Sequence, residues 1–140
     1  KTWLIVDGPP GIGCPVIAAL ARVDLALIVT EPTLSGIHDM ERVVDLAAHF
    51  GVTTKVVINK CDINWNNTQA IEEVCQRREI EVIGRLPFSE EVVRSLVLGI
   101  PVVEFSHGEI AEEIATLWRK IEAIFQEEGV ALGDKKEERL

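Results

Sequence analysis

Four short runs rich in apolar residues divide the chain and predict four β-strands. The runs are Trp3–Val6, Leu25–Val29, Lys55–Ile58 and Glu81–Leu86. The first two are unbroken, which is typical of strands buried on both faces. Gly84 interrupts the fourth run and makes it the weakest of the set.

Apolar residues at three- and four-residue spacing predict helices between these runs and after them. Serines and glycines that suit helix ends help to place the helix boundaries. We expect a first helix over 16–21 and a second that begins at a cap, Ser35, and ends at Gly51. A third is expected over 68–78, and a fourth from its cap, Ser89, to Leu98. A last helix is expected to follow a capping box formed by Ser106 and Glu109. Asn64–Asn67 is expected to be a loop.

The regular alternation of strand and helix predicts an α/β fold. Such alternation implies parallel strands joined by right-handed crossovers, with helices on both faces of the sheet in three layers. All strand carboxyl ends then lie at one edge, where open α/β sheets place their ligands. The residues expected at this edge are Asp7, Thr30–Glu31, Asn59–Asp62 and Pro87–Phe88.

Asp7 ends the first predicted strand and is followed by the glycine- and proline-rich loop Gly8–Gly13. A carboxylate in this position fits a Walker B acid, which holds Mg²⁺, usually through water. The backbone amides of Gly11 and Gly13 can approach a γ-phosphate. A tight strand-to-helix turn with an incidental aspartate remains the alternative.

The sequence Asn59-Lys60-Cys61-Asp62 follows the third predicted strand. A side-chain amide or carboxylate at a strand end can bind the edge of a purine ring, and the stem of Lys60 can cover its face. The pattern N-K-x-D also occurs in GTP-binding proteins, where the aspartate accepts hydrogen bonds from guanine. The four residues can also simply end the strand, so three interpretations stay open.

A phosphate-binding loop of the form G-x-x-x-x-G-K-[ST] does not occur in the sequence. Either the chain is not a nucleotide enzyme, or the loop lies upstream of Lys1. The sequence enters a core-type strand directly after Lys1, and we therefore expect a fragment of a longer protein.

Composition narrows the classes of partner. The chain has 140 residues, which favours one domain, and a formal net charge of -9, which disfavours a nucleic-acid surface or a polybasic membrane patch. No secretory leader or apolar span of about 18 residues is seen. The three cysteines lack C-x-x-C spacing and indicate a reduced, cytoplasmic setting. The three histidines are scattered without metal-ligand spacing.

The segment from Ile5 to Gly51, with its motifs D-G-P-P-G and T-E-P-T, precedes V-V-I-N-K-C-D at 56–62. Together these residues resemble the carboxyl-terminal half of the MinD/ParA/Mrp class of P-loop ATPases. The resemblance covers about 2–127 and is closest to MinD-superfamily members with an inserted ferredoxin-like domain. It implies a P-loop NTPase-like α/β/α fold that lacks its Walker A portion here. Residues 1–128 would form part of the nucleotide-binding domain, and 129–140 a charged, disordered tail.

The resemblance also implies roles for individual residues. Asp7 matches the Walker B acid, which organises Mg²⁺ through water, and the switch II loop begins with the nucleotide-binding residues Gly8, Pro9, Pro10 and Gly11. Asn59 matches the residue that contacts adenine, and Pro87 lies in the segment that packs beside the base. Lys60 and Asp62 of the N-K-x-D pattern complete the expected nucleotide-binding residues. Thr30–Pro32 matches a loop at the nucleotide or dimer face.

The function implied for the intact protein is a dimerising, ATP-driven switch that needs Mg²⁺ and is linked to iron–sulfur or redox chemistry. The signature lysine of Walker A and the cysteines for a 4Fe–4S cluster would lie before Lys1, so the fragment itself is expected to be inactive. Two alternatives stay open: a GTP-binding switch that uses Asn59–Asp62, and a non-catalytic flavodoxin-like interaction module.

Overall fold

The computed structural model describes the backbone of residues 2–137 and the side chains as far as Glu127. The chain divides into two compact units, Lys1–Phe88 and Ser89–Leu140. The elements in order are α1 (Cys14–Leu20), β1 (Leu25–Thr30), α2 (Leu34–His49), β2 (Thr53–Asn59), α3 (Trp65–Arg77), β3 (Glu81–Leu86), α4 (Glu90–Leu98), α5 (Val102–Phe105) and α6 (Glu109–Glu137).

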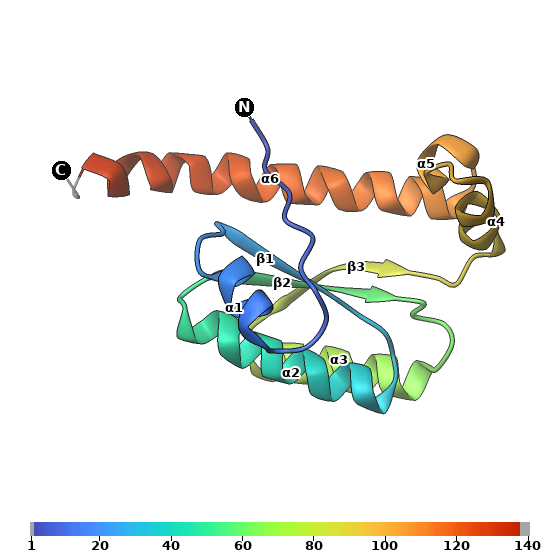
Figure 1. Ribbon diagram of the computed structural model, residues 1–140, viewed down its shortest axis with the longest axis horizontal. Helices are drawn as coiled ribbons and strands as arrows, with labels where there is room; N and C mark the ends of the chain where they lie inside the picture. Colours follow the sequence, from blue (N-terminus) through green and yellow to red (C-terminus); the bar gives the residue numbers. More distant parts are fainter. Residues whose placement is uncertain (1, 138–140) are drawn as a thin grey trace. The chain divides into compact units, whose positions relative to one another are not determined.

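The first unit contains a three-stranded sheet in the order β1-β2-β3. Both strand pairs are parallel, and β2 and β3 point the same way in Figure 1. The register of β2 against β3 shifts between Val56 and Val57, so that Val57 lies opposite Gly84. The sequence prediction of a parallel α/β fold is confirmed.

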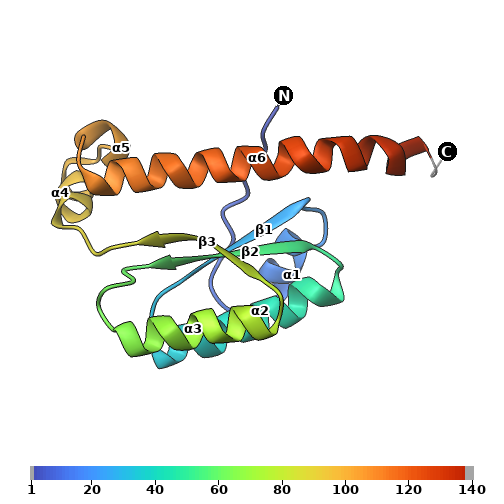
Figure 2. The same ribbon diagram turned by 180° about the vertical axis from the view of Figure 1, so that it is seen from behind.

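Helices α1, α2 and α3 lie on the same side of this sheet in both views (Figures 1 and 2). The main core forms where α2 and α3 pack against β2, because these elements each turn an apolar face inward. Its buried members are Met40, Val44, Val56, Ile58, Cys61, Ile71, Val74 and Cys75. A smaller cluster joins α1 to β1 and α2 through Val16, Leu20, Ala26 and Ala47.

The first predicted strand is wrong. Trp3–Val6 forms no strand, and Leu4 and Ile5 are 88% and 76% exposed. A strand forms only where a neighbour accepts and donates its backbone hydrogen bonds, and among the described residues no strand lies beyond β1. Val29 in β1 is correspondingly 60% exposed, so β1 is not buried on both faces as predicted.

Two helix starts differ from the prediction. Thr33, not Ser35, caps α2, because the Thr33 hydroxyl oxygen accepts a hydrogen bond from the backbone N–H of Gly36 at 3.0 Å. Asn64 caps α3 by accepting from the N–H of Asn67 at 3.0 Å. The residues expected as loop after Asn64 therefore form the first turn of α3.

The second unit contains α4, α5 and α6. Ser89 caps α4, and Gly99 ends it in the left-handed conformation, both as predicted. The short helix α5 was not predicted. Ser106 does not form the predicted capping box with Glu109. Its hydroxyl donates to Glu91 Oε2 at 2.7 Å and accepts from the N–H of Gly108 at 3.0 Å.

Helix α6 continues to Glu137, and the predicted tail 129–140 lies outside the residues whose side chains are described. The disorder expected for 129–140 stays a prediction. Among the described residues, no helix combines the length and apolar character needed to cross a lipid bilayer.

Candidate functional site

The carboxyl ends of the three strands meet at one edge of the sheet, which we call the strand-end rim (Thr30–Pro32, Asn59–Asp62 and Leu86–Phe88). The parallel register produces this arrangement, since Thr30 lies opposite Ile58 and Asn59 lies opposite Leu86. The prediction that these three segments share an edge is confirmed. The rim is therefore the place in the first unit where polar strand-end side chains gather.

The first and second segments of the rim are joined by side-chain contacts. Lys60 Nζ forms an ion pair with Glu31 Oε1 at 3.0 Å, and both side chains are partly exposed. Nearby, Asn67 Nδ2 donates a hydrogen bond to the carbonyl oxygen of Pro32 at 3.1 Å. The loop after β1 is thus held to the loop after β2 and to the first turn of α3.

The second and third segments are joined in a similar way. The N–H of Cys61 donates to the carbonyl oxygen of Leu86 at 3.0 Å. One residue further along, Asp62 Oδ1 accepts from the N–H of Phe88 at 2.8 Å. These two bonds extend the contact between β2 and β3 past the ends of both strands and hold Pro87 between them.

Asn59 and Lys60 have an unusual local geometry. Asn59 Oδ1 accepts a hydrogen bond from the N–H of Lys60 at 3.0 Å. Lys60 adopts the left-handed conformation, with φ of 52°, which costs a residue with a side chain roughly 1–2 kcal/mol. The Asn59 amide nitrogen makes no hydrogen bond within the described residues, so the amide presents two N–H donors at the rim.

Gly36 allows α2 to begin close against the rim. A Cβ atom built at Gly36 would lie 2.3 Å from the carbonyl oxygen of Glu31, closer than any real contact. The hydroxyl of Thr30 also donates to the carbonyl oxygen of Gly36 at 3.0 Å. Glycine is required here because any side chain would push the Glu31 loop away.

The predicted site residues of the amino-terminal segment are placed differently. Asp7 and the loop Gly8–Gly11 are exposed, and among the described residues no hydrogen bond or ion pair joins Asp7 to the strand-end rim. The structure brings Asn59, Lys60, Asp62 and Pro87 together, but it does not show Asp7 as the end of a strand. The role predicted for Asp7 stays a prediction.

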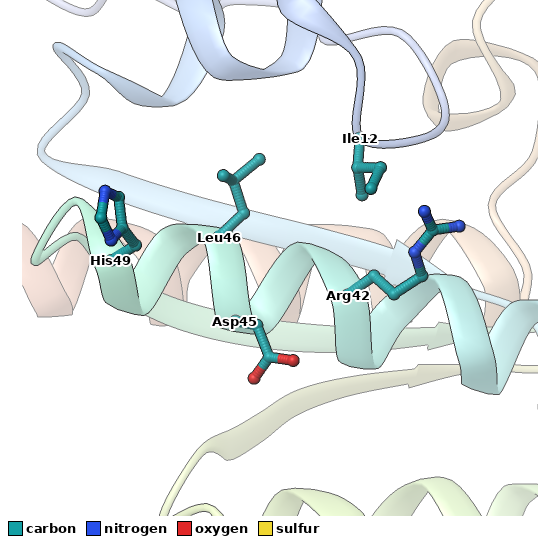
Figure 3. Close-up of a pocket in the computed structure, with 5 residues that line it drawn as sticks. All are labelled: Ile12, Arg42, Asp45, Leu46 and His49. Atoms are coloured by element: carbon teal, nitrogen blue, oxygen red, sulfur yellow. The ribbon is translucent and has the colours of Figure 1, made fainter.

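A hollow of about 370 Å³ lies elsewhere in the first unit, between the loop before α1 and the part of α2 that carries Arg42, Leu46 and His49 (Figure 3). Ile12 faces Arg42 and Leu46 across it, and His49 lies at its other end (Figure 3). Asp45 points away from Ile12 and forms an ion pair with Arg78, the residue that follows α3. The hollow begins about two helical turns along α2 from the rim and brings together none of the predicted site residues.

The described part of the chain holds no cluster of metal-binding side chains, and Cys61 and Cys75 are buried. No three histidine, cysteine or acidic side chains gather there in a way that could hold a metal ion. Burial raises the pKa of the Cys61 thiol, and the adjacent Asp62 carboxylate raises it further. Burial likewise raises the pKa of Cys75, whereas Cys14 is exposed.

No role was predicted for Asn67, Thr33 or Gly36 from the sequence. The sequence nevertheless contains patterns that could have indicated the two helix starts. Asn64-x-x-Asn67 is a pattern typical of a helix start, and a threonine three residues before a glycine can cap through that glycine's N–H. What the sequence did not show is which of two neighbouring hydroxyl residues caps the helix.

A comparison with protein-family models matches residues 2–122 to a ParA model described as NUBPL iron-transfer P-loop NTPase. Among curated proteins, the chain is 32% identical over 117 residues to an uncharacterized protein of Methanocaldococcus jannaschii, covering 84% of this chain and 38% of that protein. It is 29% identical over 136 residues to the septum site-determining protein MinD of Thermotoga maritima, covering 93% of this chain and 49% of MinD. The chain therefore spans half or less of the length of these relatives.

Solved structures give the same result. The MinD cell division protein of Aquifex aeolicus matches with a TM-score of 0.70 and 26% identity, over 83% of this chain and 51% of that one. The cell division ATPase MinD of Pyrococcus furiosus matches with a TM-score of 0.73 over 84% of this chain and 50% of that one; at 23% identity, it supports the fold alone. Since the family model spans most of the sequence, the chain belongs to the ParA/MinD-type family of P-loop NTPases.

Proposed function

We propose that this chain supplies the base-binding part of an ATP-dependent switch, with adenine held at the strand-end rim. The observation that carries the proposal is Asn59, whose amide oxygen is engaged by Lys60 while its two N–H donors remain available at the rim. Family membership supports a nucleotide ligand. A MinD from Pyrococcus horikoshii, with the same fold at 18% identity, was solved in complex with Mg-ADP.

The residues present suit the groups that the family implies. Asn59 would hold the adenine, and Pro87 would pack beside it. Asp7 offers one exposed carboxylate, which suits Mg²⁺ because this ion keeps several waters and needs few protein ligands. Gly8–Gly11 would form a loop near the phosphates. Mg²⁺, when bound, would neutralise phosphate charge.

We further propose that residues 1–128 form the carboxyl-terminal part of a MinD-like nucleotide-binding domain and that this part alone is inactive. The sheet edge at β1 supports this, because Val29 is 60% exposed and the apolar residues Leu4 and Ile5 are 88% and 76% exposed. A further parallel strand next to β1 would pair with its open backbone edge and offer Trp3–Val6 a pairing partner. The segment Trp3–Val6 would then become a strand of the completed sheet.

The intact protein would act as a homodimer in the cytoplasm and serve iron–sulfur or redox chemistry. The iron-transfer description of the matching family supports the link to iron. The described residues hold no cluster of metal-binding side chains, so ligands for a 4Fe–4S cluster would come from another part of the protein. The free thiols suit a reducing compartment.

The test is equilibrium binding of ATP with Mg²⁺ to the intact protein. Asn59→Ala removes the proposed adenine contact and should weaken ATP binding at least about tenfold, because a nucleobase hydrogen bond is lost in a desolvated site. Asn66→Ala, on the exposed first turn of α3, is the matched control and should bind as the parent does. Equal affinity of the Asn59→Ala variant and the parent would contradict the proposal.

A GTP-binding switch is the second candidate, and the spacing of Asn59 and Asp62 is the observation that favours it. Competition between ATP and GTP for the intact protein separates the two functions. A clear preference for GTP would replace the proposed function, and binding of neither nucleotide would favour a non-catalytic interaction module.

A further inference from the structure

We propose that Asp62 is a positioning residue that fixes the segment Pro87–Phe88, and that it does not bind the nucleotide base. We call the hydrogen bond from the N–H of Phe88 to Asp62 Oδ1 the rim clasp; it measures 2.8 Å. The part of this inference that concerns nucleotide affinity rests on the proposed function. The part that concerns the clasp itself does not.

The geometry gives the clasp a clear structural role. The N–H of Cys61 bonds to the carbonyl oxygen of Leu86 at 3.0 Å, which is the last backbone contact between the second and third rim segments. The next residue is Pro87, which has no N–H to donate. The Asp62 carboxylate supplies the next bond, and a charged acceptor makes this bond stronger than a neutral one. The clasp therefore orders a segment that the sheet no longer holds.

A second contact holds the opposite side of the same loop. The ion pair between Lys60 and Glu31, at 3.0 Å, joins the second rim segment to the first. Asn59 comes just before Lys60 and Asp62 in the sequence, and its Oδ1 accepts a hydrogen bond from the N–H of Lys60. The side chains of Lys60 and Asp62 are thus both engaged in holding loops, while the amide nitrogen of Asn59 faces no partner in the described residues.

Base binding makes a different demand on an aspartate. A carboxylate that binds guanine uses its two oxygens to accept from a ring N–H and from the neighbouring amino group. In this chain one of these oxygens already accepts from Phe88. Turning the carboxylate toward a base would break the clasp and release Pro87–Phe88, the segment proposed to pack beside that base. We infer that the lysine and the aspartate of the N-K-x-D pattern in this chain join the three segments of the rim.

Two substitutions separate the roles. Asp62→Asn keeps an oxygen at the position of Oδ1 and so keeps an acceptor for the N–H of Phe88. For a carboxylate that binds guanine the same change is severe, because the amide replaces one acceptor with N–H donors that face the donors of the base. Asp62→Ala removes the acceptor in either case.

The first measurement is hydrogen exchange of the Phe88 amide, resolved by NMR, in the intact protein without nucleotide. Exchange should become about three- to tenfold faster in Asp62→Ala, matching the loss of one modest hydrogen bond, and stay near the parent rate in Asp62→Asn. Asp39→Ala removes a charge from an exposed position on α2 and is the control, with no change expected. Unchanged Phe88 exchange in Asp62→Ala would overturn the proposal.

The second measurement is the dissociation constant of ATP and of GTP for the same variants. ATP binding should weaken about three- to tenfold in Asp62→Ala, because the freed segment must be ordered again on binding, and the ATP-to-GTP ratio should stay constant. Asp62→Asn should bind ATP as the parent does. A changed ATP-to-GTP ratio in Asp62→Asn would show that Asp62 contacts the base and would overturn the proposal.

The two measurements also separate this inference from the proposed function. If the parent binds neither nucleotide, the proposed function fails, but Phe88 exchange still decides whether Asp62 holds the third rim segment. If the parent binds ATP and Phe88 exchange does not respond to Asp62→Ala, the clasp fails while the ATP-binding proposal stands.

Discussion

The strand-end rim and the amino-terminal segment Thr2–Gly13 carry the two halves of the predicted site, and the two regions differ in how many contacts hold their side chains. At the rim, hydrogen bonds and an ion pair join three loops that are far apart in sequence. In the amino-terminal segment, Asp7 is exposed, and Leu4, Ile5 and Val6 before it are exposed as well. The candidate base-binding half is built by this chain, while the candidate phosphate-binding half is not.

The difference follows from which neighbours each region has. The rim loops leave β1, β2 and β3, which pair with one another, so their starting points are fixed by backbone hydrogen bonds. The segment Trp3–Val6 has the apolar sequence of a strand, but no strand described in this chain pairs with it. A local sequence pattern therefore specifies a strand only when its partner is present.

The largest contrast is expected in stability. Ile58→Ala, at a fully buried position of β2, should lower the free energy of unfolding of the 140-residue chain by about 2–5 kcal/mol, because it leaves a cavity in the core. Ile5→Ala should change it by less than about 0.5 kcal/mol, since Ile5 is 76% exposed. Urea denaturation measures both. A loss of several kcal/mol for Ile5→Ala would show that the amino-terminal segment is packed.

The next effect concerns activity in the intact protein. Asp7→Ala should lower Mg²⁺-dependent ATP hydrolysis by at least about 100-fold, because the proposed ligand of the metal is lost. The thermal midpoint should hardly change, since Asp7 is exposed and makes no ion pair within the described residues. Glu41→Ala, a change in charge on α2, serves as the control. Unchanged hydrolysis would remove Asp7 from the proposed site.

The rim could be predicted from the sequence as a place but not as a set of contacts. Apolar runs located β1, β2 and β3 to within about two residues, and parallel pairing then required their ends to share an edge. The contacts of Lys60 with Glu31 and of Asp62 with Phe88 depend on the register between neighbouring strands. Register is a property of three-dimensional pairing, and no local pattern in this chain shows it.

The errors at the helix ends have a related cause. Ser35 and Thr33 are both good capping residues, and the sequence favours neither. The choice of Thr33 follows from the close approach of Gly36 to the loop at Glu31, a tertiary contact. The short helix α5 is also set by its surroundings, because four residues are too few to form a helix by propensity alone.

Gly36 tests how tightly the rim is packed. Gly36→Ala should destabilise the chain by about 1–3 kcal/mol, because the added methyl group would lie 2.3 Å from the carbonyl oxygen of Glu31. Leu34→Ala, at a position in the same helical turn that is 79% exposed, is the control and should be near neutral. Thermal denaturation of both variants measures the difference. Equal thermal midpoints for the two variants would mean that the Glu31 loop can move aside without a loss of stability.

The smallest expected effect is a pH dependence in the core beneath the rim. Burial raises the pKa of Cys61 and Cys75 above the ordinary value of 9.0, so the unfolded chain loses these protons first as pH rises. Their contribution to stability is complete below pH 9 and declines as pH rises past it. Urea denaturation at pH 7, 9 and 10 should show the decline, reduced in Cys75→Ala. An equal decline in the parent chain and in Cys75→Ala would exclude Cys75 as a source of the pH dependence.

The central claim is that this chain holds the base-binding half of the site and leaves the phosphate-binding half unformed. Hydrogen exchange of backbone amides in the 140-residue chain, resolved by residue, tests the claim most directly. We predict slow exchange at Lys60, Cys61 and Phe88, whose N–H groups are hydrogen-bonded, and exchange close to that of an unfolded peptide at Leu4, Ile5 and Val6. Equal protection of the two groups of amides would contradict it.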